Sequence, residues 1–128
     1  MVRGVGTDIV EVGRIRRLLQ RHGDRFLARI LTPEEMTYCT SQTRPAEHVA
    51  GRFAAKESVL KALGAGLFSG IGLHEICIRR GPAGAPEVGL TGGAEQAASA
   101  AGIRRVHVSI SHTGAAAVAV AVADDEGG

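Results

Sequence analysis

The sequence predicts an α+β fold: a single compact domain in which a small, mainly antiparallel sheet packs against a long central helix and shorter helices. Its 128 residues suffice for one domain with one hydrophobic core. Segments with the alternating side chains of strands lie before and after segments of helical periodicity, and no internal repeat or linker separates them. We therefore expect one domain over residues 1–123 and a frayed tail at 124–128.

The first half of the chain is expected to contain one strand and four helices. The strand covers residues 2–12 and carries Gly4, Gly6 and Asp8 on one face, because side chains alternate along a strand. The clearest helix start is Thr32-Pro33, where threonine can cap the helix and proline suits its first turn. The expected helices cover residues 14–21, 26–31, 32–42 and 46–63.

The second half is expected to contain four strands and one alanine-rich helix, after a glycine-rich loop at 64–72. One strand alternates, with valine and isoleucine on one face and His107, Ser109 and Ser111 on the other. In the last strand valines alternate with alanines, which predicts burial on both faces. The expected strands cover residues 73–80, 87–90, 104–112 and 115–123, and the expected helix covers 94–101.

The composition is that of a globular protein with a core of small side chains. Hydrophobic residues make up 45% of the chain, yet only three Phe and one Tyr are aromatic, against 18 Gly. Such a core buries little area per residue, so association into an oligomer would be a natural way to bury more. No membrane-spanning run or signal peptide is evident. Cys39 and Cys77 lack metal-site spacing, which suggests buried thiols in a reducing cytoplasm.

The net charge of +2 conceals a strongly basic segment. Only Asp24 opposes the arginines of this segment, and arginine favours bidentate contacts with phosphate or carboxylate. An acidic protein, an anionic ligand or nucleic acid could bind it. Nucleic acid is the least favoured, because the aromatic side chains needed for base stacking are nearly absent. The arginines are Arg14, Arg16, Arg17, Arg21, Arg25 and Arg29.

The long helix carries three charges on or beside its apolar face. At 100° per residue Lys56 falls within the apolar stripe, Glu57 on its edge, and Lys61 one turn after Glu57. Half-buried charges must be paired or must face a ligand. One interpretation is a Glu57–Lys61 pair, with Lys56 extending to water. The other is a bound anion or metal ion.

Two further polar groups interrupt apolar strands. Asp8 is either a local structural residue or, with Glu57, part of a site for a hard cation such as Mg²⁺, which needs one or two carboxylates beside substrate phosphates. Ser109, Ser111 and His112 are either an outward polar face or contacts for an anion or nucleobase. A Ser-His-Asp hydrolase is disfavoured, because Ser111 and His112 point to opposite faces and the G-x-S-x-G motif is absent.

Four blocks of the chain, in order, resemble the small, stand-alone holo-[acyl-carrier-protein] synthase type of 4′-phosphopantetheinyl transferase. They are GVGTDIVEV at 4–12 with Arg14-Ile15, the segment 26–39, AGRFAAKES at 50–58 with Lys61, and VSISHT at 108–113. Thr7 and Leu73 depart from residues usual in the family, as does the run of small residues at 117–120. None of these departures touches the proposed chemistry, and the last bears on subunit packing.

The resemblance implies the transfer of phosphopantetheine from coenzyme A to a serine of an acyl carrier protein. Asp8 and Glu57 would bind Mg²⁺ against the diphosphate of coenzyme A. Lys61 would support the charge of the leaving phosphate or help to deprotonate the serine, with Glu57 or a metal-bound water as other possible bases. The residues implied in coenzyme A binding are Arg52, Lys56, Gly70, Ser109, Ser111 and His112.

The resemblance also implies partners. Arg14, Arg21 and Arg25 would dock the acidic carrier protein, and the family's small members are trimers with active sites between subunits. Two alternatives stay open: a non-catalytic relative that binds coenzyme A or a carrier protein, and a basic module for nucleic acid. The first is disfavoured because Asp8, Glu57 and Lys61 are all present.

Overall fold

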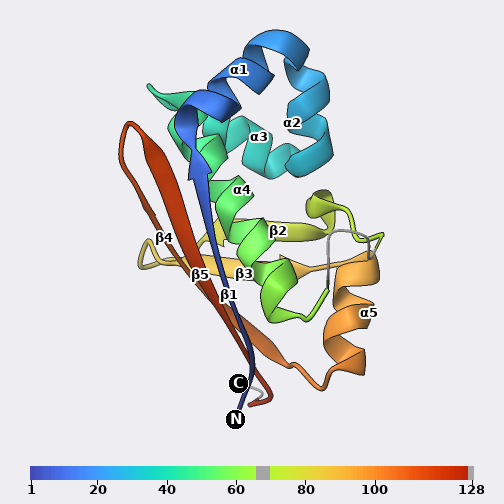
Figure 1. Cartoon of the computed structure of the whole chain (residues 1–128). Coiled ribbons are helices and arrows are strands. Elements are labelled where there is room, and N and C mark those ends of the chain that lie inside the picture. Colours follow the sequence, from blue (N-terminus) through green and yellow to red (C-terminus); the bar gives the residue numbers. More distant parts are fainter. Residues whose placement is uncertain (66–69, 127–128) are drawn as a thin grey trace.

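The protein is an α+β domain whose longest helix lies against a three-stranded sheet, as the computed structural model in Figure 1 shows. The structure describes residues 1–65 and 70–126. In chain order its elements are β1 (Val2–Glu11), α1 (Val12–His22), α2 (Asp24–Ile30), α3 (Pro33–Thr40), α4 (Pro45–Ala62), a 3₁₀ turn η1 (Leu73–Glu75), β2 (Ile76–Arg80), β3 (Pro86–Leu90), α5 (Gly92–Ala100), β4 (Arg105–His112) and β5 (Ala116–Asp124).

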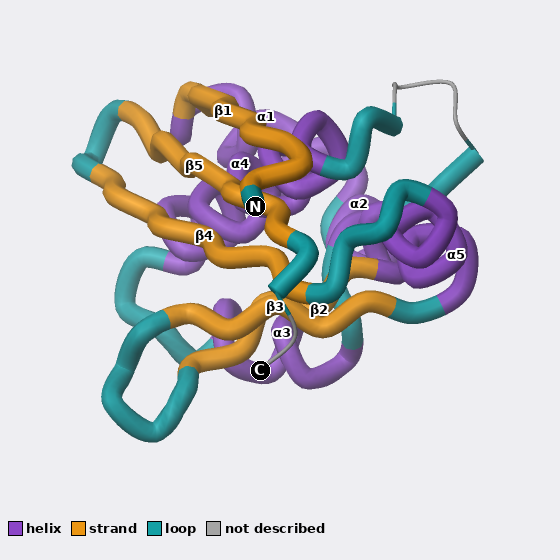
Figure 2. Tube along the Cα trace, turned by 90° about the horizontal axis from the view of Figure 1, so that it is seen from below, coloured by secondary structure: helices purple, strands orange, loops and turns teal. Residues whose placement is uncertain are grey.

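The described strands form two antiparallel sheets. The larger has the order β1-β5-β4, so the last strand lies between the first strand and the fourth, and the smaller is the β2–β3 hairpin. Helix α4 runs along one face of the larger sheet, and α1, α2 and α3 gather at one end of it (Figure 1). The hairpin and α5 lie at the far side of α4 from β1, as the view from below confirms (Figure 2).

Most expected elements are present, with shifted ends. The strand expected at 73–80 begins only at Ile76, because Leu73–Glu75 form a 3₁₀ turn. Pro45 is the first residue of α4. The cap at Thr32 is confirmed: its hydroxyl accepts from the Glu35 amide, and its own amide donates to the Glu35 carboxylate at 2.8 Å.

The expected fraying at 124–128 is wrong for the described part of that segment. Asp124 is the last residue of β5 and pairs with Val2. The carboxylate of Asp125 then accepts hydrogen bonds from the N-terminal ammonium at 2.7 Å and from Arg3 at 3.0 Å. The two ends of the chain are therefore tied to each other.

The prediction that the last strand is buried on both faces is also wrong. Its alanine face lies wholly buried under α4, whereas Val118 and Val120 are 41% and 38% exposed. Val5 and Ile9 lie on the same outer face and are 58% and 69% exposed. We call these four residues the open sheet face. The expected alternation of β4 is confirmed, with Val106, Val108 and Ile110 packed toward the core.

Helix α4 touches the backbone of β1 at two glycines. A Cβ atom added at Gly6 would lie 2.0 Å from the Ser58 carbonyl oxygen, and one added at Gly4 would lie 1.9 Å from the Ala62 carbonyl oxygen. Neither distance is possible for a real side chain, so both positions require glycine. The contact brings the next residue on this strand face, Asp8, up to the helix.

Candidate functional site

Asp8 of β1 and Glu57 and Lys61 of α4 meet where the strand and helix touch. The Lys61 ammonium donates a hydrogen bond to the Thr7 carbonyl at 2.7 Å and lies 3.5 Å from an Asp8 carboxylate oxygen. Asp8 keeps 20% of its side chain exposed and Lys61 keeps 55%. The pair formed here is thus Lys61–Asp8, and the Glu57–Lys61 pair considered from the sequence is not among the ion pairs of the described residues.

The electrostatics of Glu57 are unfavourable to its charge. Burial raises the pKa of this carboxyl, and the negative charge of Asp8 raises it further, while Lys61 and Arg14 act in the opposite direction. Two carboxylates that lie close together at a partly exposed position would be stabilised by a cation between them. Within residues 1–65 and 70–126 no group of three or more metal-binding side chains comes together. Asp8 and Glu57 therefore suit a hard cation that takes its remaining ligands from water or a substrate phosphate.

A second group of polar side chains lines a hollow of about 420 Å³ beside the first half of α4. The Arg52 guanidinium lies 4.3 Å from the centre of the Tyr38 ring, and its Nε is buried with no hydrogen-bond partner among the described atoms. His112 lies 3.3 Å from a Glu47 carboxylate oxygen and its ring packs edge-on against His48. Burial lowers the pKa of His48, and the neighbouring His112 and Arg52 lower it further.

This hollow contains two of the predicted residues and several that sequence reasoning missed. Arg52 and His112 are the predicted ones, and Tyr38, His48 and Arg80 were not foreseen. Positive charge beside an aromatic ring and imidazoles suits a ligand with both an anionic group and a planar base. Helical spacing could have revealed His48, which precedes Arg52 by four residues on one face of α4.

The two serines predicted as ligand contacts lie on the opposite face of the sheet from Asp8. Ser109 and Ser111 pair with Val120 and Val118, so they stand beside the open sheet face. Asp8 pairs with Ala119 and faces α4 on the other side of the sheet. A single copy of the chain therefore does not bring these serines to the carboxylates. Gly70 is exposed, and its φ of +80° explains why a glycine stands there.

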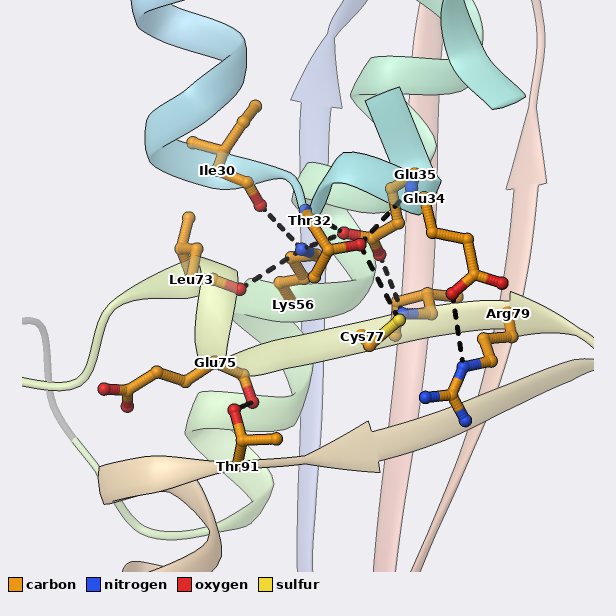
Figure 3. A network of polar contacts seen from close by, with 11 residues as sticks. Ile30, Thr32, Glu34, Glu35, Lys56, Leu73, Glu75, Cys77, Arg79 and Thr91 are labelled. Atoms are coloured by element: carbon orange, nitrogen blue, oxygen red, sulfur yellow. Dashed lines mark hydrogen bonds and ion pairs between the residues drawn. The ribbon is translucent and has the colours of Figure 1, made fainter. Parts of the chain in front are cut away.

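The predicted contact between Lys56 and a phosphate is wrong, as is its extension to water. This side chain is 0% exposed, and its ammonium donates to Glu35 at 2.5 Å, to the Ile30 carbonyl at 2.6 Å and to the Leu73 carbonyl at 3.2 Å (Figure 3). With three acceptors in the core it has no route to an external ligand. The sequence signal that was missed is Thr32-x-x-Glu35, a capping box whose glutamate becomes buried.

The predicted docking arginines are exposed on α1 and α2. Arg14 lies over the Phe53 ring, 5.9 Å from its centre, and is near enough to Glu57 to lower the pKa of that carboxyl. Arg21 follows Arg14 two turns later, and Arg25 borders a shallow groove of about 260 Å³ together with Leu18, His22, Phe26 and Arg29. The basic surface thus extends from the carboxylates to a partly apolar groove.

Two further predictions concern the cysteines and membrane-spanning helices. Cys39 and Cys77 are free thiols, and burial raises the pKa of Cys39 to about 11, which makes it unreactive. Among the described residues no helix has both the length and the apolar character needed to cross a membrane.

Comparison with known proteins places this chain in one class. The family model of the 4′-phosphopantetheinyl transferase superfamily matches residues 4–121, and the chain belongs to this superfamily.

Several of its relatives within the superfamily are holo-[acyl-carrier-protein] synthases. A holo-[acyl-carrier-protein] synthase of Koribacter versatilis is 47% identical over 125 residues, which cover 98% of this chain and all of the relative. The crystal structure of the synthase from Neisseria meningitidis superposes with a TM-score of 0.87 at 38% identity, covering 97% of this chain and 99% of that one. The Helicobacter pylori synthase, solved in complex with coenzyme A, gives 0.82 at 32% identity, covering 94% and 99%.

The raised pKa of Glu57 generates a prediction about stability. A carboxyl whose pKa is raised by folding contributes its stability fully below the unfolded pKa and loses it as the pH rises through the folded pKa. In the presence of a chelator at pH 7, the ionised Glu57 therefore costs stability, and Glu57→Gln should raise the melting temperature. The gain should vanish below about pH 4, near the ordinary glutamate pKa.

Thermal denaturation in EDTA at several pH values measures this effect. Glu87→Gln, on the exposed side of β3, serves as the matched control. A lower melting temperature for Glu57→Gln than for the control at pH 7 would contradict the electrostatic account of the carboxylates.

Proposed function

We propose that this protein transfers the 4′-phosphopantetheine arm of coenzyme A to a serine hydroxyl of an acyl carrier protein and releases adenosine 3′,5′-bisphosphate. One observation carries the proposal: in a member of this superfamily, Asp8, Glu57 and Lys61 are not merely present but meet at a half-open position. The related synthases of Helicobacter pylori and Bacillus anthracis have been solved in complex with coenzyme A, which supports the same donor here.

The residues at this position divide the work of phosphoryl transfer. The serine oxygen forms a bond to the phosphorus that carries pantetheine, and its proton passes to Glu57 or to a water molecule. The bond from that phosphorus to the bridging diphosphate oxygen breaks, leaving the bisphosphate. The Lys61 ammonium contacts two oxygen atoms, of Thr7 and Asp8, and its positive charge would stabilise the leaving phosphate. Asp8 and Glu57 fit Mg²⁺, which when bound would neutralise the charge of the diphosphate.

The basic surface on α1 and α2 would receive the carrier protein. Arg14 lies beside the carboxylates, whereas Arg21 and Arg25 lie further along the helices. An acidic partner held on Arg21 and Arg25 would bring its serine to the Arg14 end, where the site lies. Charge complementarity of this kind accelerates encounter and fixes orientation. Together with the free thiols, these substrates suit a cytoplasmic location.

The non-catalytic alternative has less support. A protein that only bound coenzyme A would not need two carboxylates brought together, since the charge of Asp8 raises the pKa of Glu57 and so the cost of ionising it. Nucleic acid has still less, because the chain offers almost no aromatic side chains for stacking.

We further infer that the protein is a homotrimer with shared sites. The open sheet face presents four large apolar side chains, which a water-soluble protein rarely leaves uncovered. The serines beside it, Ser109 and Ser111, are separated from Asp8 within one copy. Packing copies through this face would cover the apolar residues and let residues of one copy complete the site of another.

The transfer is tested by the intact mass of a carrier protein. With coenzyme A and Mg²⁺ the wild-type protein should add one phosphopantetheine arm, and Asp8→Ala or Glu57→Ala should lower the rate on the order of 10²–10³-fold, the loss typical for one charge-stabilising group. The double variant should be no slower than the worse single one, because the two carboxylates act as a unit.

Glu95→Ala, exposed on α5, is the control variant and should keep its activity. A wild-type protein that modifies no carrier protein would refute the proposed transfer. Full activity of either carboxylate variant, or undiminished activity in EDTA, would refute the metal assignment alone.

The trimer is tested by light scattering at micromolar concentration. Val120→Lys places a charge in the middle of the open sheet face and should dissociate the assembly, with loss of transfer because the sites are shared. Ala101→Lys, exposed at the end of α5, should leave the mass unchanged. A wild-type mass equal to one chain would contradict the trimer.

A further inference from the structure

Lys56 and Glu35 connect α4 to four elements on the side away from the larger sheet. The Lys56 ammonium joins α4 to the end of α2 at Ile30, to α3 at Glu35 and to η1 at Leu73. The second oxygen of Glu35 accepts from the Ile78 amide of β2 at 2.7 Å. Figure 3 shows these groups converging on the ammonium.

A gain in stability does not by itself explain why the protein has this buried ion pair. Burial lowers the pKa of Lys56, and the charge of Glu35 beside it offsets part of that effect. Buried ion pairs can often be replaced by neutral residues of similar volume without loss of stability, since desolvation cancels much of their attraction. A pair with several directed hydrogen bonds instead fixes the orientation of the elements that it joins.

Helix α4 needs an orienting contact, because its interface with β1 and β5 has little relief. Gly51 meets the Ile110 side chain of β4, but further along the helix Ser58 and Ala62 lie against the glycines of β1, beside the buried alanines of β5. Small side chains on both surfaces interlock weakly, so they resist rotation of the helix about its axis less than large ridges do. On the sheet side the Lys61 ammonium contacts Thr7 and Asp8 but is half exposed, whereas the directed contacts of Lys56 on the opposite side are fully buried.

We propose that Glu35 and Lys56 are positioning residues for phosphopantetheine transfer, which hold α4 at the rotation that turns Glu57 toward Asp8. Glu57 follows Lys56 directly, about 100° around the helix, so any rotation that releases Lys56 also displaces the Glu57 carboxylate. Neither positioning residue touches the substrate. The inference rests on the proposed function of the carboxylates.

The test replaces the charged pair by a neutral one of similar volume, Glu35→Gln with Lys56→Met. The glutamine amide oxygen can still accept from Thr32 or Ile78, so the fold should persist. We expect kcat to fall by about 10- to 100-fold, since small displacements of a reacting group have effects of that size. The KM values for coenzyme A and carrier protein should stay within about twofold, because no binding contact is removed.

A readout without catalysis comes from the backbone amide resonances of Thr7 and Asp8. These residues contact neither Glu35 nor Lys56 but lie against Lys61 and Glu57, so displacement of α4 should shift their signals. The control is Ile103→Ala, which destabilises the core between α5 and β4, away from the pair, and should leave kcat and both resonances unchanged.

Three results would overturn the positioning role. The first is a kcat of the double variant equal to that of the wild type, and the second is an equal fall of kcat in the Ile103→Ala control. The third is a raised KM for coenzyme A with unchanged kcat, which would make Lys56 a ligand contact. If the double variant does not fold, Glu35→Gln alone should show a smaller fall of kcat at constant KM, and an unchanged kcat would refute the proposal. Absence of transfer by the wild-type protein would count against the proposed function instead.

Discussion

The architecture depends on the direct contact between the backbone of β1 and helix α4. Gly4 and Gly6 leave no room for a side chain between strand and helix, and only this closeness lets the next residue of the strand face, Asp8, reach Glu57 and Lys61. The same closeness requires small residues on the neighbouring strand β5, whose alanines are buried while its valines point outward. The small-residue composition and the open sheet face are therefore two consequences of one packing constraint.

Periodicity allowed the sequence to predict which face each polar residue occupies. A period of two placed Asp8 with the glycines of β1, and this placement is confirmed. The stripe expected on α4 is broader than predicted, because the helix is buried on nearly all sides, and Glu57 is one of its few half-buried positions. The proximity of Asp8 and Glu57 was beyond such reasoning. It follows from the strand order β1-β5-β4 and from the path of α4 across this sheet, which no local pattern encodes.

The errors have physical causes of the same kind. The helical spacing placed Lys56 within the apolar stripe but could not show how its charge would be paired, and the side chain is fully buried while that of Lys61 is half exposed. The difference is made by Glu35, which comes 21 residues before Lys56 and lies on another helix. Likewise, alternating valine and alanine in β5 cannot reveal which side is covered. The tight approach of α4 selects the alanines, against the usual expectation that the larger apolar side chains are buried.

The most direct test of this account is Gly6→Ala, compared with Gly13→Ala. A methyl group at Gly6 would collide with the Ser58 carbonyl, so α4 must move away from β1, whereas one at Gly13 makes only an ordinary contact with Arg17. We expect Gly6→Ala to lose about 1–3 kcal/mol of stability from overpacking. Its transfer rate per folded molecule should fall by about 10²-fold, because Asp8 is displaced from Glu57 and Lys61. Gly13→Ala should transfer at the wild-type rate. Equal rates for the two variants would contradict the claim that the contact between β1 and α4 creates the site.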